Sequence, residues 1–484
     1  MTNQEKPSLG PLPDYITSAK PNPLDKRAPW YATIAPTYAG IFLWFVFWQD
    51  AVRAPNAGGL LSQGLGWALL SIVIAALVCH FLFYLAPGML GMKTGLPLYI
   101  VGTSTFGAKG GFILPGFLMG VLQFGWLGVN VYFSSMALGA FFGLEGGSAA
   151  VKLIMVVWGV AAAFIGLKGI QYVAKVATYL PLIPLVILIV LLAKTVGSVG
   201  DFSAAKLIDV SKEINPGVGA PLTTFGVLAF ALTYIVGFFA TAGAAGTDIA
   251  SSGRDKNDVS MGGLIGIGLA TIVTAGISAL VVAGVYGNPE MTKQAIEAGM
   301  KISADQGGPS AILQSTALTP IILGKSAGLV MFLLAVAAFP SACFSSLIAA
   351  NSFKTTLSSV NPFVSVGIGA AVSILLALTG WAGKAIIVFQ IIGASFGPIC
   401  GAMLVDYLIN GRTWSGPRAG FNPAGWISWA LGFIVGILPI VKIYDVPAAP
   451  VAAFIVGAVV YFLCAKAGML SRLISLPAAE AAKK

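Results

Sequence analysis

Three side chains that form hydrogen bonds interrupt a long apolar stretch of the sequence. Gln123, Trp126 and Asn130 lie in "GVLQFGWLGVNVYF", spaced by three and then by four residues. On an α-helix this spacing places all three on one face. A lipid-facing helix gains nothing from an amide, because a polar group left unpaired in hydrocarbon costs several kcal/mol. The pattern therefore predicts that this face points into the protein, toward polar partners or a bound ligand.

The composition indicates where such a helix lies. Of the 484 residues, 57% are hydrophobic and only 9% are charged, whereas soluble domains carry about 25% charged residues. With a mean hydropathy of +0.90, the chain has too little polar surface for a water-soluble globule of this size. The 60 glycines and 27 prolines also fit membrane helices, in which both are frequent. We predict an all-α, multi-pass membrane protein.

Apolar segments of about 20 residues predict about twelve membrane-spanning helices. Residues 1–28 are polar and proline-rich and are expected to form a flexible tail, as are residues 469–484. Most of the 27 lysines and arginines fall in these tails and in the loops of the same side, so the positive-inside rule places both termini in the cytoplasm of a cell membrane. The net charge of +10 therefore requires no nucleic-acid partner. The predicted spans are 31–51, 60–85, 111–142, 150–167, 173–194, 223–249, 261–286, 319–350, 361–381, 385–410, 425–441 and 448–466.

Spans one and six contain helix breakers in corresponding places. Pro36 lies inside the first span with Gly40 one turn later, and three glycines lie between residues 237 and 246 of the sixth. A proline inside a helix removes a backbone hydrogen bond. Small residues also simply allow close helix packing, but paired interruptions point to an inverted repeat with a central binding site. We predict one transport domain, 29–468, with repeats at 31–194 and 223–410 and two extra helices within 425–466.

Charged residues inside the predicted spans lie near their ends. Asp248 closes the sixth span and Asp406 the tenth, where loop arginines such as Arg254 and Arg412 are expected to pair with them. Asp50 ends the first span on the opposite side and is expected to be solvated. No acidic residue falls plainly at the middle of a span, so the sequence offers no evident carboxylate that carries a proton.

Four motifs resemble the nucleobase–cation symporter-1 family, nearest the bacterial cytosine permeases. They occur in chain order between residues 93 and 412. The motifs are "KTGLPLYIVGTSTFGAKGG" (93–111), "GVLQFGWLGV" (120–129), "GFFATAGAAGTDIASSGRD" (237–255) and "GASFGPICGAMLVDYLINGR" (393–412).

The resemblance implies a twelve-span symporter with a five-plus-five inverted repeat. Its substrate would be a nucleobase or a related flat heterocycle such as cytosine, with allantoin, a hydantoin or a pyrimidine vitamin precursor as alternatives. In this interpretation Trp126 and Phe239 cover the two faces of the ring, and Gln123 pairs with its edge. The family's substrate-binding positions fall on Gln123, Trp126, Gly237, Phe238, Phe239 and Thr241.

The resemblance also implies a cation site between spans one and eight. Ala342 stands where a second hydroxyl belongs, and Cys343 where the family has an asparagine. Hard cations prefer about six oxygen ligands or more, so the site is weakened, completed by water or absent, and both Na+ and H+ remain open as the coupling ion. The residues that would supply oxygens to Na+ are Ala39, Phe42, Ala338 and Ser341.

Other functional classes find less support in the sequence. A membrane receptor or channel is the alternative class, but no pore-lining polar rings or filter sequence is evident. One histidine, His80, and four scattered cysteines argue against an enzyme or a metal cluster. No nucleotide-binding motif points to ATP-driven transport. We expect no cofactor other than the coupling ion and no nucleic-acid partner, and the oligomeric state stays open.

Overall fold

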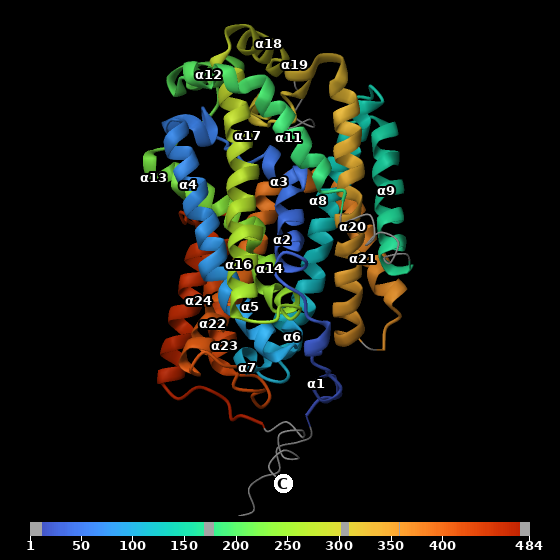
Figure 1. The fold of residues 1–484 in the computed structure, drawn as a ribbon, viewed down its shortest axis with the longest axis vertical. Coiled ribbons are helices and arrows are strands. Elements are labelled where there is room, and N and C mark those ends of the chain that lie inside the picture. Colours follow the sequence, from blue (N-terminus) through green and yellow to red (C-terminus); the bar gives the residue numbers. More distant parts are fainter. Residues whose placement is uncertain (1–11, 169–178, 302–308, 358, 475–484) are drawn as a thin grey trace, which may run out of the picture.

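Long helices run side by side from one end of the molecule to the other (Figure 1). The computed structural model describes residues 12–168, 179–301, 309–357 and 359–474. Within these ranges, nine helical stretches are long and apolar enough to cross a membrane, and three shorter apolar helices accompany them. This confirms the predicted all-α membrane fold. The beginning of the fifth predicted span, at 173–178, lies outside the described residues.

The helices that correspond to the twelve predicted spans follow in chain order. The first six spans are α2 (Ile34–Leu43) with α3 (Phe45–Gln49); α4 (Leu65–Val78), η3 (Cys79–Tyr84) and α5 (Leu85–Thr94); η4 (Phe112–Phe117) and α8 (Leu118–Phe141); α9 (Ala149–Lys168); α11 (Leu182–Thr195); and α13 (Thr224–Ala231), η6 (Leu232–Val236), α14 (Gly237–Ala244) and α15 (Gly246–Ala250). The last six are α16 (Lys256–Gly263), η7 (Leu264–Leu269) and α17 (Ala270–Gly287); α20 (Ala327–Thr356); α21 (Pro362–Leu378); α22 (Ala385–Ile409); α23 (Pro423–Ile437); and α24 (Ala449–Lys466). The stretches η3, η4, η6 and η7 are π-helical turns within longer helices.

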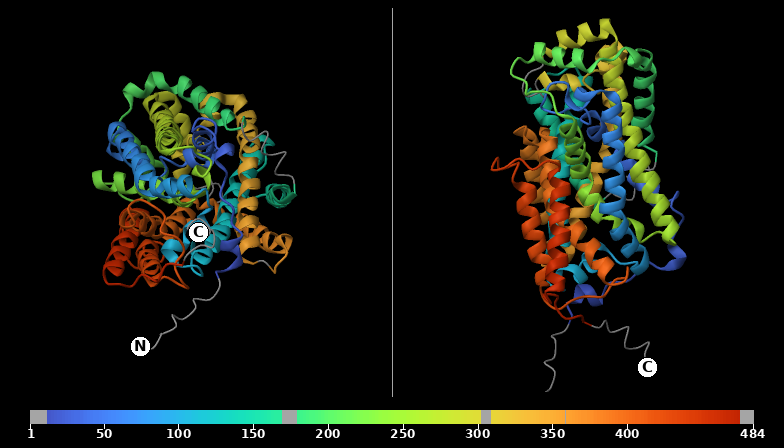
Figure 2. Two further views of the ribbon diagram at one scale, coloured as in Figure 1. Left: turned by 60° about the horizontal axis from the view of Figure 1, so that its bottom comes forward. Right: turned by 90° about the vertical axis from the view of Figure 1, so that its left-hand side faces the viewer.

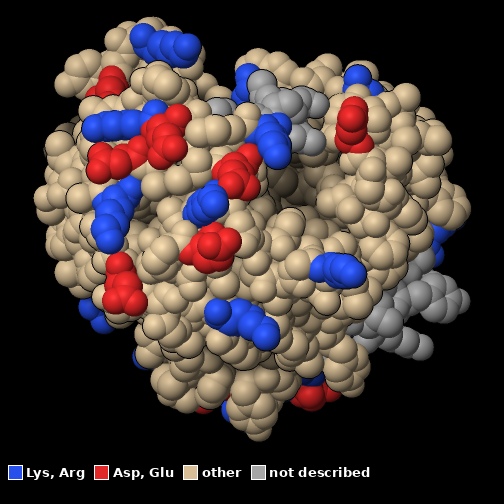
Figure 3. All heavy atoms as spheres, turned by 90° about the horizontal axis from the view of Figure 1, so that it is seen from above, with Lys and Arg blue, Asp and Glu red and all other residues tan. Residues whose placement is uncertain are grey.

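Short helices lie at the two ends of the bundle. The lower end of Figure 1 holds α1 (Asp14–Thr17), α6 (Leu98–Val101) and α7 (Thr103–Phe106), and the described chain begins and ends there. The upper end holds α12 (Ala204–Ile214), α18 (Pro289–Gly299) and α19 (Thr319–Leu323). The α18 helix lies in the loop after span seven. Acidic and basic groups are interspersed over the upper end (Figure 3).

The spans pack as an inverted repeat predicts, with partners five positions apart in the chain. Spans three and eight pair through α8 and α20, spans four and nine through α9 and α21, and spans two and seven through α4 and α17. The last three spans, α22, α23 and α24, pack on one another as a separate group, which stands at one flank in both views of Figure 2. This group of three spans contacts the other spans mainly through α14 of span six.

The first span is interrupted at Trp44, and not around Pro36 as the sequence suggested. Pro36 lies in the first turn of α2, where a helix does not need the missing N–H. The helix ends at Leu43, and Trp44 takes an extended conformation (φ −59°, ψ 122°) before α3 begins at Phe45. The break therefore falls eight residues later than the proline.

The sixth span carries a milder interruption. Its π-helical turn η6 precedes α14, and Ala245 separates α14 from α15. Gly237 and Gly246 begin these two helices, and both lie in close contacts. A Cβ at Gly237 would lie 2.7 Å from the Phe389 carbonyl oxygen, and one at Gly246 would lie 2.8 Å from the Tyr84 ring. The glycines thus serve close packing as well as the interruption.

The expected flexible N-terminal tail is bound to the lower end from residue 12 onward. The Tyr15 hydroxyl donates to the Ala108 carbonyl, and the Asn22 amide donates to the Ser251 carbonyl at 3.1 Å. The Arg27 guanidinium donates to the Met92 carbonyl at 2.5 Å. These acceptors are backbone carbonyls, which the sequence does not reveal.

Asp50 is buried at the upper end, which corrects the expectation that it is solvated. Its side chain is only 1% exposed, so it needs partners within the protein. It accepts a hydrogen bond of 2.6 Å from the Gln314 amide and pairs with Arg53 at 3.5 Å. The Thr316 hydroxyl likewise donates to the Gln49 side chain at 2.6 Å. The segment before α19 is therefore fastened to the end of the first span.

Asp248 and Asp406, the other two acidic residues discussed above, are held at the lower end by partners different from those expected. Asp248 accepts from the backbone N–H of Leu98 at 3.3 Å, whereas Arg254 pairs with Asp258 at 2.8 Å. Asp406 pairs with Arg418 at 3.7 Å instead of Arg412. Both carboxylates thus have partners within the protein, although these are not the arginines that were expected.

Candidate functional site

The polar face of α8 points into the protein, as its spacing predicted. Gln123 and Asn130 are buried, and Trp126 is half-buried. The helix packs against α20, α9 and α21, which enclose it. The three side chains nevertheless have different surroundings.

Asn130 is fully engaged within the protein. Its amide nitrogen donates to the Ala338 carbonyl at 2.9 Å. Its oxygen accepts from the Trp158 indole at 3.1 Å and from the Ser134 hydroxyl at 3.2 Å. The residue therefore joins α8 to α20 and α9, and we assign it a structural role.

Gln123 has a much weaker partner. Its amide nitrogen donates to the Met119 sulfur at 3.6 Å, and a thioether is a poor acceptor. The side chain is only 6% exposed, so it is shielded from bulk water. A ligand that offers oxygen or nitrogen to this amide would improve on the sulfur contact.

Trp126 connects α8 with the sixth span and with α22. Its indole N–H donates to the Thr241 hydroxyl at 3.3 Å. Its ring centroid lies 5.1 Å from that of Phe238, nearly perpendicular at 88°. It lies 5.2 Å from that of Phe389, tilted by 32°. Four residues from three spans therefore meet at this indole, and three of them were predicted site residues.

Phe239, predicted to lie opposite Trp126, faces other rings in this structure. Its ring stacks on Phe42 at 5.6 Å and 17°, and it lies 5.7 Å from Tyr38. Successive side chains on a helix point about 100° apart, so Phe238 and Phe239 cannot share one direction. In this structure the ring of the sixth span that contacts Trp126 is that of Phe238.

Two aromatic residues of the site were not found from the sequence. Trp44 lies 5.9 Å from Trp126 and 6.3 Å from Phe238, and Phe389 contacts both of the latter. Trp44 stands in the aromatic run "LWFVFW" at the helix break, which is a signal that could have identified it. Phe389 lies in a uniformly apolar stretch and gives no such signal.

The predicted cation positions are distributed over two helices with different neighbours. Ala39 and Phe42 lie on α2, which packs on η7 and α16, while α20 packs on α8 and α9. The Ala338 carbonyl already accepts from Asn130, and Ser341 is partly exposed. Among the described residues no group of three or more His, Cys, Asp or Glu could hold a metal ion. The donor set is thus three carbonyls and one hydroxyl, which suits a hard cation in kind but is low in number.

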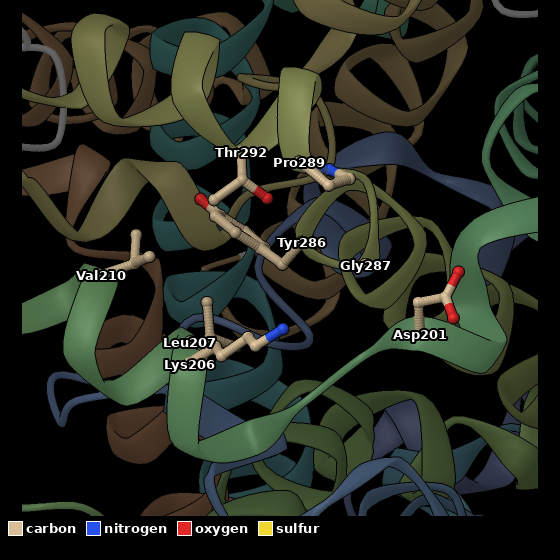
Figure 4. Close-up of a pocket in the computed structure, with 8 residues that line it drawn as sticks. All are labelled: Asp201, Lys206, Leu207, Val210, Tyr286, Gly287, Pro289 and Thr292. Carbon is tan, nitrogen blue, oxygen red and sulfur yellow. The ribbon is translucent and has the colours of Figure 1, made fainter.

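A hollow of about 270 Å³ lies at the upper end, away from these residues (Figure 4). Asp201 and Lys206 contribute opposite charges to its wall. None of its lining residues is a predicted site residue. They are Asp201, Lys206, Leu207, Val210, Tyr286, Gly287, Pro289 and Thr292.

Sequence comparison connects part of the chain with known permeases. No family model matches the chain. The cytosine permease of Escherichia coli (strain K12) is 26% identical over 204 residues, which are 41% of this chain and 43% of the permease. The cytosine permease of Escherichia coli O157:H7 matches equally. The match thus extends over less than half the length of these relatives.

Structure comparison extends over nearly the whole chain. The inward-facing conformation of Mhp1 has a TM-score of 0.61 at 17% identity and covers 94% of this chain and 95% of its own. Mhp1 is described as a nucleobase-cation-symport-1 family transporter, and its closed conformation with bromovinylhydantoin bound has a TM-score of 0.58 at 16% identity, covering 95% and 97%. A Na+-coupled sialic acid symporter has a TM-score of 0.53 at 12% identity, covering 96% and 93%.

These structural similarities establish a shared fold, and the sequence relatives are permeases, which are not enzymes, as was predicted. The four motifs agree with both comparisons. Both comparisons therefore support the resemblance to the nucleobase–cation symporter-1 family.

Proposed function

We propose that this protein is a secondary transporter that imports a flat nitrogen heterocycle of the nucleobase type, such as cytosine, together with a cation by alternating access. The observation that carries the proposal is the position of Gln123 and Trp126. They lie on the inward face of α8, where Trp126 contacts the sixth span and α22. The cytosine permease relatives and the hydantoin ligand of the closed Mhp1 structure support the substrate class.

A flat heterocycle presents two π faces and an edge of donors and acceptors. In our proposal Trp126 stacks on one face and Phe238 turns to cover the other, so that the present perpendicular contact of 88° opens around the ring. Gln123 exchanges its sulfur contact for the ring edge. Gly237 and Thr241 adjoin these rings on the sixth span. Aromatic stacking of this kind contributes about 1–3 kcal/mol per base.

A hydantoin is the second candidate substrate. It is a smaller flat ring with the same amide edge, and the Mhp1 structure in the closed conformation holds bromovinylhydantoin. Allantoin shares that edge and belongs to the same test. Gln123 and Trp126 suit all of these ligands, because they contact only one ring face and one hydrogen-bonding edge and do not enclose the whole ligand.

The coupling ion is Na+ or H+ in this proposal. Ala39, Phe42, Ala338 and Ser341 are the proposed sources of oxygen for Na+. We further propose that the lower end of the molecule faces the cytoplasm of a cell membrane. Most of the 27 lysines and arginines lie in the tails and loops assigned to that side, as the positive-inside rule requires.

Binding calorimetry on the purified protein tests the substrate class. At least one of cytosine, uracil, hypoxanthine, allantoin and hydantoin should bind, and Trp126→Ala should weaken that binding by about 5- to 150-fold. Trp67→Ala is a matched control, because Trp67 donates to the Thr224 carbonyl at 2.7 Å and contacts none of the site residues named above. If the wild-type protein binds none of these five compounds, the proposed substrate class is wrong.

A further inference from the structure

Trp44 occupies an unusual place in the first span. It is the extended residue between α2 and α3, so its side chain leaves the chain where neither helix continues. The side chain is nevertheless buried, with 8% of its surface exposed. The sequence comparison with the family gave no role to this position.

The indole N–H of Trp44 has no hydrogen-bond acceptor among the described residues. A buried donor without a partner costs about 1–3 kcal/mol, and native proteins leave few of them. Other tryptophans in this chain are paired: Trp48 donates to the Leu43 carbonyl at 3.1 Å, and Trp158 donates to Asn130. The donor on Trp44 therefore calls for an explanation.

The location of the ring supplies one. Trp44 lies 5.9 Å from Trp126 and 6.3 Å from Phe238, the two rings between which we place the substrate. An indole nitrogen donates and never accepts, so Trp44 can recognise only an acceptor. Flat heterocycles of the proposed class carry ring carbonyl oxygens, which are such acceptors.

We propose that Trp44 is a specificity-determining residue that donates its indole N–H to a ring carbonyl oxygen of the substrate. The inference rests on the proposed function, because it assigns one more contact within the same site. Trp44 then donates to the ring carbonyl oxygen, while Gln123 forms hydrogen bonds with the neighbouring amide edge. A ring without the carbonyl leaves the indole donor unpaired and is bound less tightly.

The test compares Trp44→Phe with the wild type by binding calorimetry. Cytosine is the probe, and 4-aminopyrimidine, the same ring without the carbonyl, is the matched ligand. We expect the substitution to weaken cytosine binding by about 5- to 150-fold and to leave 4-aminopyrimidine binding within about twofold. Uracil and 4-pyrimidinone, which lacks one of the two uracil carbonyls, form a second pair. Trp48→Phe, which removes an indole N–H from the same span, should alter neither affinity.

A melting curve separates this role from a structural one. Trp44→Phe should melt at the same temperature as the wild type or higher, because it removes an unpaired buried donor. A lower melting temperature with unchanged affinities would show instead that the N–H stabilises the fold against the Trp126 ring, and would overturn the inference. Equal loss of both ligands would also overturn it. Each of these results leaves the proposed function intact, whereas a wild type that binds no heterocycle contradicts both proposals.

Discussion

The three residues on the inward face of α8 have different roles, and hydrogen bonding distinguishes them. Asn130 uses both ends of its amide within the protein, whereas Gln123 donates only to a weak sulfur acceptor. The spacing in the sequence predicted the shared face, but not this division. It depends on which helices pass opposite each residue, and one of them, α20, is remote from α8 in the chain.

Gln123→Leu should change substrate selection more than stability. The substitution keeps the volume and removes the amide, so ligands with a ring amide or amidine edge should bind more weakly. Aromatic ring analogues without that edge should bind as before. Competition binding against cytosine measures both, and equal loss for the two ligand classes would show that Gln123 only supports the helix.

Asn130→Leu should show the opposite behaviour. It leaves the Ala338 carbonyl and the indole N–H of Trp158 without their side-chain partner in a buried place. We expect a loss of about 1–3 kcal/mol in unfolding free energy for each such group. Thermal unfolding in detergent checks this, with Gln123→Leu as the comparison variant. An unchanged melting temperature for Asn130→Leu would contradict the structural role of Asn130.

At the level of helices, the sequence identified which spans are interrupted, but not the residue at which the first span breaks. Pro36 was the visible breaker, yet it falls in the first turn of α2, and the break occurs at Trp44. Phe239 likewise faces Phe42 and Tyr38 rather than Trp126, because neighbouring residues on a helix face different partners. Such errors concern a few residues along a helix, and only tertiary packing corrects them.

The residues directly before α19 are fastened to the end of the first span at the upper end. Gln314→Leu removes the 2.6 Å hydrogen bond to the buried Asp50 carboxylate. Hydrogen bonds to charged groups contribute about 1.5–3 kcal/mol, so the variant should unfold at a lower temperature. Gln294→Leu, on the exposed face of α18, is the control and should melt as the wild type does. Equal melting temperatures for the two variants would show that the Gln314 bond adds no stability.

The proposed cation site depends on one side-chain oxygen, that of Ser341. Ser341→Ala should therefore remove most of the stimulation of uptake by sodium, because the three remaining ligands are backbone carbonyls. Ser346→Ala is a control on the same helix, where the hydroxyl donates to the Ala342 carbonyl at 3.4 Å. Sodium stimulation that persists in Ser341→Ala would place the ion elsewhere or leave H+ as the coupling ion.

At the scale of the whole molecule, composition and hydropathy predicted the membrane fold, and the paired breaks predicted the repeat. Both predictions depend on the lipid environment, because a chain that crosses a bilayer must form long apolar helices there. The fastening of the N-terminal segment to the lower end was not predictable. Tyr15, Asn22 and Arg27 bind backbone carbonyls, and a sequence does not show which carbonyls will be near.

Uptake by liposomes that contain the purified protein shows whether it transports a heterocycle together with a cation. Radiolabelled cytosine, uracil, hypoxanthine, allantoin and hydantoin are each offered with an inward Na+ gradient, with an inward H+ gradient and with neither. We expect at least one heterocycle to accumulate inside above its outside concentration when a cation gradient is present, and Trp126→Ala liposomes to lose this accumulation. If none of the five accumulates under either gradient, while the protein is shown to be folded by its melting curve, the claim of cation-coupled heterocycle transport is contradicted.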